Sequence, residues 1–170
     1  MDILGPFLKS DGGNVWILTM IDHFTKWPVA IPISDPNSPI IANAIFKYWI
    51  CEHGVPACIV SDQGRALISK GIQQMCASMG ISKVQTAGYS PTGNATVERF
   101  HRYFGAALCI IYERKSSNWD DYIAPVLFSY RASCNDATGY SPFMMEKGRE
   151  AMLPMSAYFP ELVERAADEN

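Results

Sequence analysis

Residues 15–33, which read VWILTMIDHFTKWPVAIPI, decide the fold class of this chain. Two apolar runs rich in β-branched residues, 15–22 and 27–33, flank the short polar stretch 23–26. Two such runs joined by a few polar residues predict a β-hairpin. A sheet therefore begins early in the chain, and the rest of the sequence must supply what covers it.

The sequence after the hairpin alternates between helical and strand patterns. Ser38 and Pro39 predict a helix start, as N-cap and first-turn proline, and apolar residues at helical spacing continue until Gly54. The further expected elements are a strand over 57–61, a helix over 70–79, a strand over 83–86, a loop over 87–94, a helix over 95–115 and a helix capped by Asn118. This order predicts an α/β fold with a mixed sheet.

Composition limits the possible classes of protein. The 170 residues can bury one good core, and the net charge of −3 lacks the general attraction for nucleic acid that marks a dedicated binder. The five cysteines form no C-x-x-C pair, which fits a reducing compartment and predicts no zinc site. We also expect no signal peptide and no membrane span, because no apolar run reaches about 18 residues. Residues 155–170 are polar and acidic, and we expect this tail to fray.

Two carboxylates stand where phosphoryl-transfer chemistry needs them. Asp62 ends the strand over 57–61 before a glycine turn, and Glu98 lies in the first turns of the long helix, with 35 residues, 63–97, between them. Two-metal catalysis requires carboxylates that converge from different segments onto one phosphate. Each residue alone also has an ordinary explanation, since aspartate forms turns and glutamate favours a helix N-terminus. By the same dipole argument, Asp120 and Asp121 are interpreted as first-turn acids of a helix.

Five stretches of the chain, in order, resemble the integrase catalytic core of retroviruses and gypsy-type LTR retrotransposons, over residues 1–154. They are MDILGPF (1–7), WILTMIDHFTKWPVAIPI (16–33), HGVPACIVSDQGR (53–65), GISKVQTAGYSPTGNATVERFHRYF (80–104) and NDATGYSPFMMEKGREAMLP (135–154). The signature of that family is D, D and then E after 35 intervening residues. In this chain Asp2, Asp62 and Glu98 occupy those places.

The resemblance implies an RNase H-like fold, with a five-stranded mixed sheet flanked by helices and Asp2 on the central first strand. It implies that Asp2, Asp62 and Glu98 are catalytic and hold two Mg²⁺ or Mn²⁺ ions. The implied reactions are trimming of retroelement DNA ends and attack of the new 3′ hydroxyls on target DNA, both direct displacements at phosphorus. The expected partners are element-end DNA, target DNA and further copies of the chain in a homodimer or higher oligomer. The expected location is the nucleus during integration and a cytoplasmic retroelement particle before that.

Other positions match the family at sites that approach DNA. They are Gln63, Gly64, Tyr89, Asn94 and Arg102. Because Arg102 lies four residues after Glu98, it shares that helix face and either meets a phosphate or pairs with the glutamate. The chain departs from the family pattern at Thr92 and Ala95, in the loop that leads to Glu98.

Three alternatives remain open at this point. Spacing alone makes Asp22, at the end of a strand, a rival of Asp2; the family pattern favours Asp2. A catalytically silent DNA-binding or protein-interaction module derived from a retroelement is the alternative function, and the intact triad argues against it. A different RNase H-like nuclease would share the fold and the metals, but the FTKW and SPTGNATVERF stretches favour an integrase core.

Overall fold

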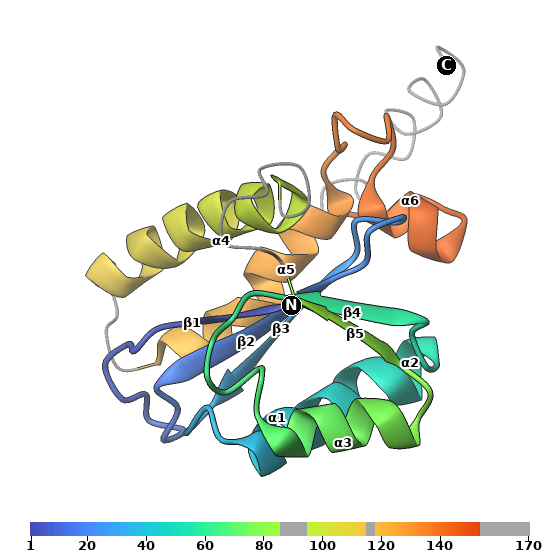
Figure 1. Ribbon diagram of the computed structural model, residues 1–170. Helices are drawn as coiled ribbons and strands as arrows, with labels where there is room; N and C mark the ends of the chain where they lie inside the picture. Colours follow the sequence, from blue (N-terminus) through green and yellow to red (C-terminus); the bar gives the residue numbers. More distant parts are fainter. Residues whose placement is uncertain (86–94, 115–117, 154–170) are drawn as a thin grey trace.

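The computed structural model describes residues 1–85, 95–114 and 118–153 (Figure 1). The elements in chain order are β1 (Asp2–Leu4), β2 (Trp16–Ile21), β3 (Pro28–Ile33), α1 (Ser38–Ile45), the π-helix η1 (Phe46–Ile50), α2 (Cys51–His53), β4 (Cys58–Ser61), α3 (Lys70–Ser78), β5 (Ser82–Gln85), α4 (Ala95–Arg114), the 3₁₀ helix η2 (Trp119–Tyr122), α5 (Ile123–Ala132) and α6 (Pro142–Lys147). Figure 1 shows α4 and α5 on one side of the strands and α1 and α3 on the other. The predicted α/β class is confirmed. The predicted tail over 155–170 lies outside the described residues.

The predicted hairpin is confirmed. β2 and β3 pair antiparallel from Trp16 opposite Ile33 to Ile21 opposite Pro28. Asp22 closes the connection, because its Oδ2 accepts hydrogen bonds from the backbone N–H groups of Phe24 at 2.9 Å and Thr25 at 2.6 Å. This is the behaviour of a turn-forming aspartate. Asp22 therefore has a structural role of its own at the strand end.

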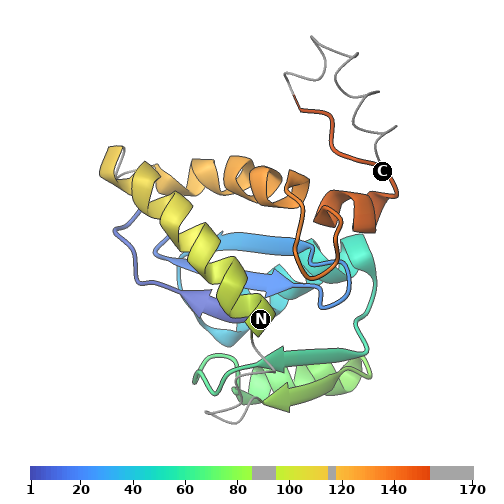
Figure 2. The same ribbon diagram turned by 90° about the horizontal axis from the view of Figure 1, so that it is seen from above.

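Within the described residues the five strands form two hydrogen-bonded groups, so the predicted five-stranded mixed sheet is not seen as one ladder. β1, β2 and β3 form an antiparallel sheet, and β4 and β5 form a parallel pair. The ammonium of Met1 donates to the carbonyl of Val60 at 2.6 Å, and this bond connects β4 to the residue before β1. β1 ladders only with β2, and Figure 2 shows the β4–β5 pair as a separate ribbon layer. Besides the Met1–Val60 bond, residues of β2, β3 and β4 that share one hydrophobic cluster join the two groups.

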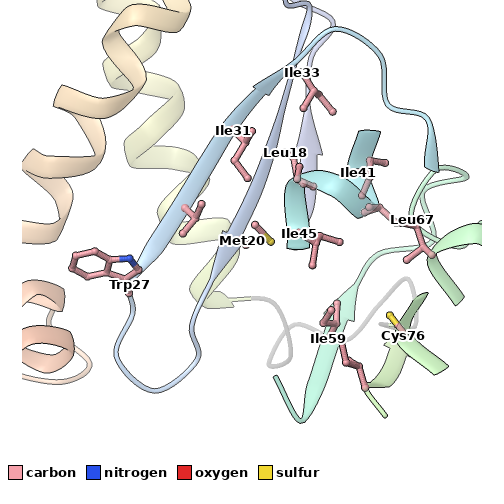
Figure 3. Packing of buried hydrophobic residues seen from close by; sticks show 14 residues of the cluster. Leu18, Met20, Trp27, Ile31, Ile33, Ile41, Ile45, Ile59, Leu67 and Cys76 are labelled. Atoms are coloured by element: carbon pink, nitrogen blue, oxygen red, sulfur yellow. The ribbon is translucent and has the colours of Figure 1, made fainter. Parts of the chain in front are cut away.

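Two hydrophobic clusters lie on opposite faces of the β2–β3 sheet. Leu18, Met20 and Ile31 belong to the first cluster, with residues of α1, α3 and β4 (Figure 3). Ile17 and Ala30 belong to the second, with residues of α4, η2 and α5. Because successive residues of a strand point to opposite faces, a sheet covered on both sides needs the nearly continuous apolar runs that 15–33 supplies.

The helix ends differ from the prediction in detail. Asn37, not Ser38, caps α1, since its side chain accepts from Ile40 N at 3.1 Å. Asn118 makes no side-chain cap bond, and a 3₁₀ turn precedes α5. Sequence reasoning missed α6, although Ser141 caps its first turn and Gly148 ends it at a φ of 69°. Serine before proline at one end and glycine at the other are the signals that predict such a helix.

A polar cluster fastens the connection between β1 and β2 to η2. Asp120 Oδ2 accepts hydrogen bonds from Ser10 Oγ at 2.5 Å and from Asn14 Nδ2 at 2.8 Å. A Cβ added at Gly12 would lie 2.7 Å from the same carboxylate oxygen, so this loop needs glycine there. The interpretation of Asp120 as a helix-dipole acid is therefore incomplete, because its carboxylate is occupied by a long-range tertiary contact. Burial raises the pKa of Asp120, but the bonds from Ser10 and Asn14 outweigh burial and hold it below the ordinary 3.8.

Asp120→Asn is expected to lower the free energy of unfolding at neutral pH by about 1 kcal/mol, because the hydrogen bonds lose a charged acceptor. A carboxyl whose pKa is depressed on folding adds stability above pH 3.8, and this stability is lost as the pH falls through the folded value. The difference between the two chains should therefore close below pH 3.8. Urea unfolding between pH 3 and 7 measures it, with the exposed neighbour variant Asp121→Asn as control. A difference independent of pH would contradict this role for the Asp120 charge.

The tryptophans at 27 and 119 are core residues. Trp119 is 1% exposed and its indole N–H donates to Leu8 O at 2.8 Å. The guanidinium of Arg131 lies 4.2 Å from the Trp27 ring and donates to Pro28 O at 2.6 Å from Nη2. Burial lowers the pKa of Arg131 to about 10, and Glu146 partly opposes this. These contacts bind α5 to β3. Among the described helices, none has the length and apolar character that a bilayer crossing requires.

Candidate active site

Asp2 is placed by the ladder between β1 and β2. It pairs with Thr19 in the register of the two strands, and the Thr19 hydroxyl donates to the carbonyl of Asp2 at 3.1 Å. The Asp2 carboxylate accepts from the N–H of Ile3 at 2.7 Å through Oδ1. Its other oxygen, Oδ2, lies 3.4 Å from Nδ1 of His101 on α4. The first predicted ligand is thus held by a strand and faces a helix.

His101 connects α4 to this strand, and sequence reasoning missed its role. Its Nε2 forms a 2.8 Å hydrogen bond with Thr19 Oγ1, while Nδ1 faces Asp2. Burial lowers the pKa of His101, and the negative charges of Asp2 and Glu98 partly oppose this. The neutral imidazole is therefore favoured over the charged form. Its signal in the sequence is its position three residues after Glu98, which places both on one face of the helix.

Glu98 lies in the first turn of α4, and its side chain is exposed. On the same helix, Val97 and Phe100 are 6% and 0% exposed and fix the helix against the sheet. Arg102 is also exposed, and within the described part of the chain no ion pair of 4.0 Å or less joins it to Glu98. Of the two interpretations of Arg102, pairing with Glu98 is therefore not the one found in this structure.

Asp62 follows β4 directly and its side chain is exposed. Its Oδ1 accepts from the N–H of Gly64 at 3.0 Å, which makes the tight turn expected for this sequence. A Cβ at Gly64 would lie 3.0 Å from that oxygen, so glycine at this position avoids a close contact with the carboxylate. Gln63 is exposed beside it. The predicted turn at the end of the strand is confirmed.

Lys83 lies near the end of β4 that Asp62 follows. The side chain of Lys83, on β5, donates to Ser61 Oγ; burial lowers its pKa, and Cys76 and Asp62 partly oppose this. Asp2 faces His101, which lies three residues after Glu98 on α4, and Met1, before Asp2, donates to Val60, two residues before Asp62. These contacts place the first residue of β1 near the end of β4 and the start of α4.

In the described residues, the three carboxylates do not surround a site for a metal ion. Among the described residues, no group of three or more His, Cys, Asp or Glu side chains is arranged to hold a metal ion. In kind, three carboxylates are the oxygen donors that magnesium prefers, so the residues fit such an ion although their present spacing does not enclose one. Tyr89 and Asn94, predicted to approach DNA, lie outside the described residues.

Comparisons with known proteins agree with this arrangement. The family model described as "Integrase core domain" matches residues 1–91. The chain is 26% identical over 154 residues to the retrovirus-related Pol polyprotein from transposon 412 of Drosophila melanogaster, covering 91% of this chain and 12% of that protein. It is 27% identical over 154 residues to gypsy retrotransposon integrase-like protein 1 of Homo sapiens, covering 91% and 29%. The chain thus spans less than a third of these relatives.

Solved structures show the same fold. The catalytic core domain of BIV integrase superposes with a TM-score of 0.66 at 19% identity, covering 85% of this chain and 90% of that one. The catalytic core domain of HTLV-2 integrase, solved with magnesium in a trimeric form, gives 0.65 at 17% identity, covering 85% and 93%. The fold is RNase H-like, as predicted. The chain belongs to the integrase core domain family, in its retroviral and retrotransposon branch.

Proposed function

We propose that this chain, over residues 1–154, is a polynucleotidyl transferase core that trims retroelement DNA ends and joins their 3′ hydroxyls to target DNA. The observation that supports the proposal is that Asp2, Asp62 and Glu98 come from neighbouring elements, β1, the end of β4 and the start of α4. Asp2 faces His101 on α4, the helix whose first turn carries Glu98, and Met1, directly before Asp2, donates to Val60, two residues before Asp62. Family membership supports the same assignment.

In this proposal the three carboxylates hold two Mg²⁺ or Mn²⁺ ions. When bound, such ions activate the attacking oxygen and stabilise the leaving oxygen of an in-line displacement. The chain itself positions the three carboxylates. The β1–β2 ladder and His101 orient Asp2, the buried face of α4 presents Glu98, and the turn at Gly64 presents Asp62.

We propose that residues near the three carboxylates contact the DNA phosphates. Gln63, the backbone of Gly64 and the exposed Arg102 lie beside the carboxylates in the sequence, and Tyr89 and Asn94 belong to the segment between β5 and α4. An exposed arginine is suited to a phosphate oxygen, because its planar guanidinium can donate two hydrogen bonds to it. We further propose action as a homodimer or higher oligomer, in the nucleus during integration and in a cytoplasmic particle before it. The exposed aromatic residues Phe46 and Tyr48, at 48% and 42%, offer apolar surface for self-association.

One observation favours a second candidate, a catalytically silent module that binds DNA or protein. The carboxylates are not gathered tightly enough to hold a metal ion in the described structure. The two functions differ in metal dependence. On a branched DNA that mimics the joined product, the transferase should resolve the branch with Mg²⁺ or Mn²⁺ and stop when EDTA is added. DNA binding without any metal-dependent cleavage or joining would favour the silent module.

A further inference from the structure

His101 links α4 to both β1 and β2 through its two ring nitrogens. Nε2 forms a 2.8 Å hydrogen bond with Thr19 Oγ1, and Nδ1 lies 3.4 Å from Asp2 Oδ2. The side chains of His101 and Asp2 are 16% and 26% exposed, so solvent and ions still reach this place. Which ring nitrogen carries the hydrogen decides what His101 offers to Asp2.

The hydrogen bonds of Thr19 fix the position of that hydrogen. A hydroxyl has one hydrogen to donate, and that of Thr19 donates to the carbonyl of Asp2 at 3.1 Å. Thr19 Oγ1 must therefore accept in its second hydrogen bond, and Nε2 of His101 is the donor. In the neutral imidazole the other nitrogen, Nδ1, then has a lone pair and no hydrogen. The lone pair of Nδ1 is on the side of the ring that faces Asp2.

The spacing between His101 and Asp2 suits two ligands of one metal ion. A charge-assisted N–H···O bond is about 2.7–2.9 Å long, which is shorter than the 3.4 Å between Nδ1 and Oδ2. Two ligand atoms that each lie about 2.0–2.2 Å from one ion, in adjacent positions, are about 3.0–3.5 Å apart. Oδ1 of Asp2 already accepts from Ile3 N, so Oδ2 is the oxygen that faces the ring.

An imidazole changes which ions this place prefers. His101 lies three residues after Glu98, so both belong to one face of α4. Magnesium takes oxygen ligands and is usually held by carboxylates and water, whereas imidazole nitrogen binds transition-metal ions. A nitrogen ligand beside carboxylates therefore strengthens the binding of a transition-metal ion more than that of magnesium.

We propose that His101 Nδ1 and Asp2 Oδ2 bind the same divalent ion, and that this chain holds a transition-metal ion such as Mn²⁺ there more tightly than Mg²⁺. The inference rests on the proposed function, because it concerns the ions assigned to Asp2, Asp62 and Glu98. It adds a nitrogen ligand to the three carboxylates. Two ligands leave further positions on the ion for another carboxylate, water or a DNA phosphate.

The test is the pulsed electron paramagnetic resonance spectrum of Mn²⁺ bound to the full chain, with and without a DNA end. Modulation of the electron spin echo by ¹⁴N detects a nitrogen bonded directly to Mn²⁺. The wild type should show this coupling, and His101→Asn should lose it. By titration calorimetry His101→Asn should also bind Mn²⁺ about tenfold more weakly. Its affinity for Mg²⁺ should change by less than about threefold, because magnesium depends on the oxygen ligands.

His23→Asn is the matched control, because His23 is exposed in the turn between β2 and β3. If His101→Asn fails to fold, the wild-type coupling is assigned by elimination, since the chain has three histidines. His23→Asn and His53→Asn should then both keep it. Bound Mn²⁺ without a nitrogen coupling in the wild type, or a coupling that disappears in either of these two variants, would overturn the inference while the proposed function stands. If the wild type binds no Mn²⁺ with or without DNA, both fail together.

Discussion

Asp2→Asn, Asp62→Asn and Glu98→Gln should each reduce metal-dependent resolution of branched DNA by about a hundredfold or more, while the fold is kept. Each change preserves the size of the side chain and removes the negative charge that a divalent ion requires. At position 62 the amide oxygen can still accept the hydrogen bond from Gly64 N, so the turn should survive. The measurement is the initial rate with Mg²⁺ or Mn²⁺, with thermal unfolding as a check on the fold.

Asp121→Asn is the matched control for these variants. Asp121 is exposed on η2, away from the three carboxylates, and its amide should leave the rate unchanged. An active Asp2→Asn variant together with an inactive Asp22→Asn variant would move the first ligand from β1 to the end of β2. Full activity in Asp62→Asn or Glu98→Gln would exclude that carboxylate as a ligand.

Phe104→Ala should lower the free energy of unfolding by about 3–5 kcal/mol, the usual cost of emptying the space of a buried phenylalanine. The Phe104 side chain is 0% exposed and stacks on Phe100 with ring centroids 5.2 Å apart. Phe100 in turn meets the edge of Tyr130 at 5.1 Å, which binds α4 to α5. Loss of the Phe104 ring should also weaken the packing of α4, the helix that carries Glu98.

Phe128→Ala provides the comparison for the same chemical change. Phe128 lies on α5 but is 37% exposed, so its removal leaves little empty space and should cost less than about 1 kcal/mol. Urea unfolding of both variants measures the difference. Equal destabilisation would show that the cluster around α4 does not hold the domain together.

Patterns that are local in the sequence predicted the elements well. The hairpin, the helices after residues 37 and 69 and the strand before Asp62 follow from apolar spacing and from glycine, proline and capping residues. Gly54 and Gly80 end their helices at positive φ, as their positions suggest. These features depend on residues that are close together in the sequence, so they can be predicted from the sequence alone.

Contacts between distant segments were not predictable from one sequence. His101 meets Asp2, and Ser10 meets Asp120, across 99 and 110 positions of the chain. Periodicity places each residue on a face but does not say which polar group it meets there. The separation of the strands into two groups was missed for the same reason, because pairing between β1 and β4 depends on how the layers pack.

That separation changes what controls the spacing of the carboxylates. Asp2 and Asp62 belong to different sheets, so no ladder of backbone bonds sets the distance between them. Apart from the single bond from Met1 to Val60, the distance depends on how Met20, Ile45 and Ile59 pack between the layers. A change of one methylene group there would move one carboxylate relative to the other without touching either. Interior residues of the first hydrophobic cluster can therefore change the geometry of the candidate site without lying in it.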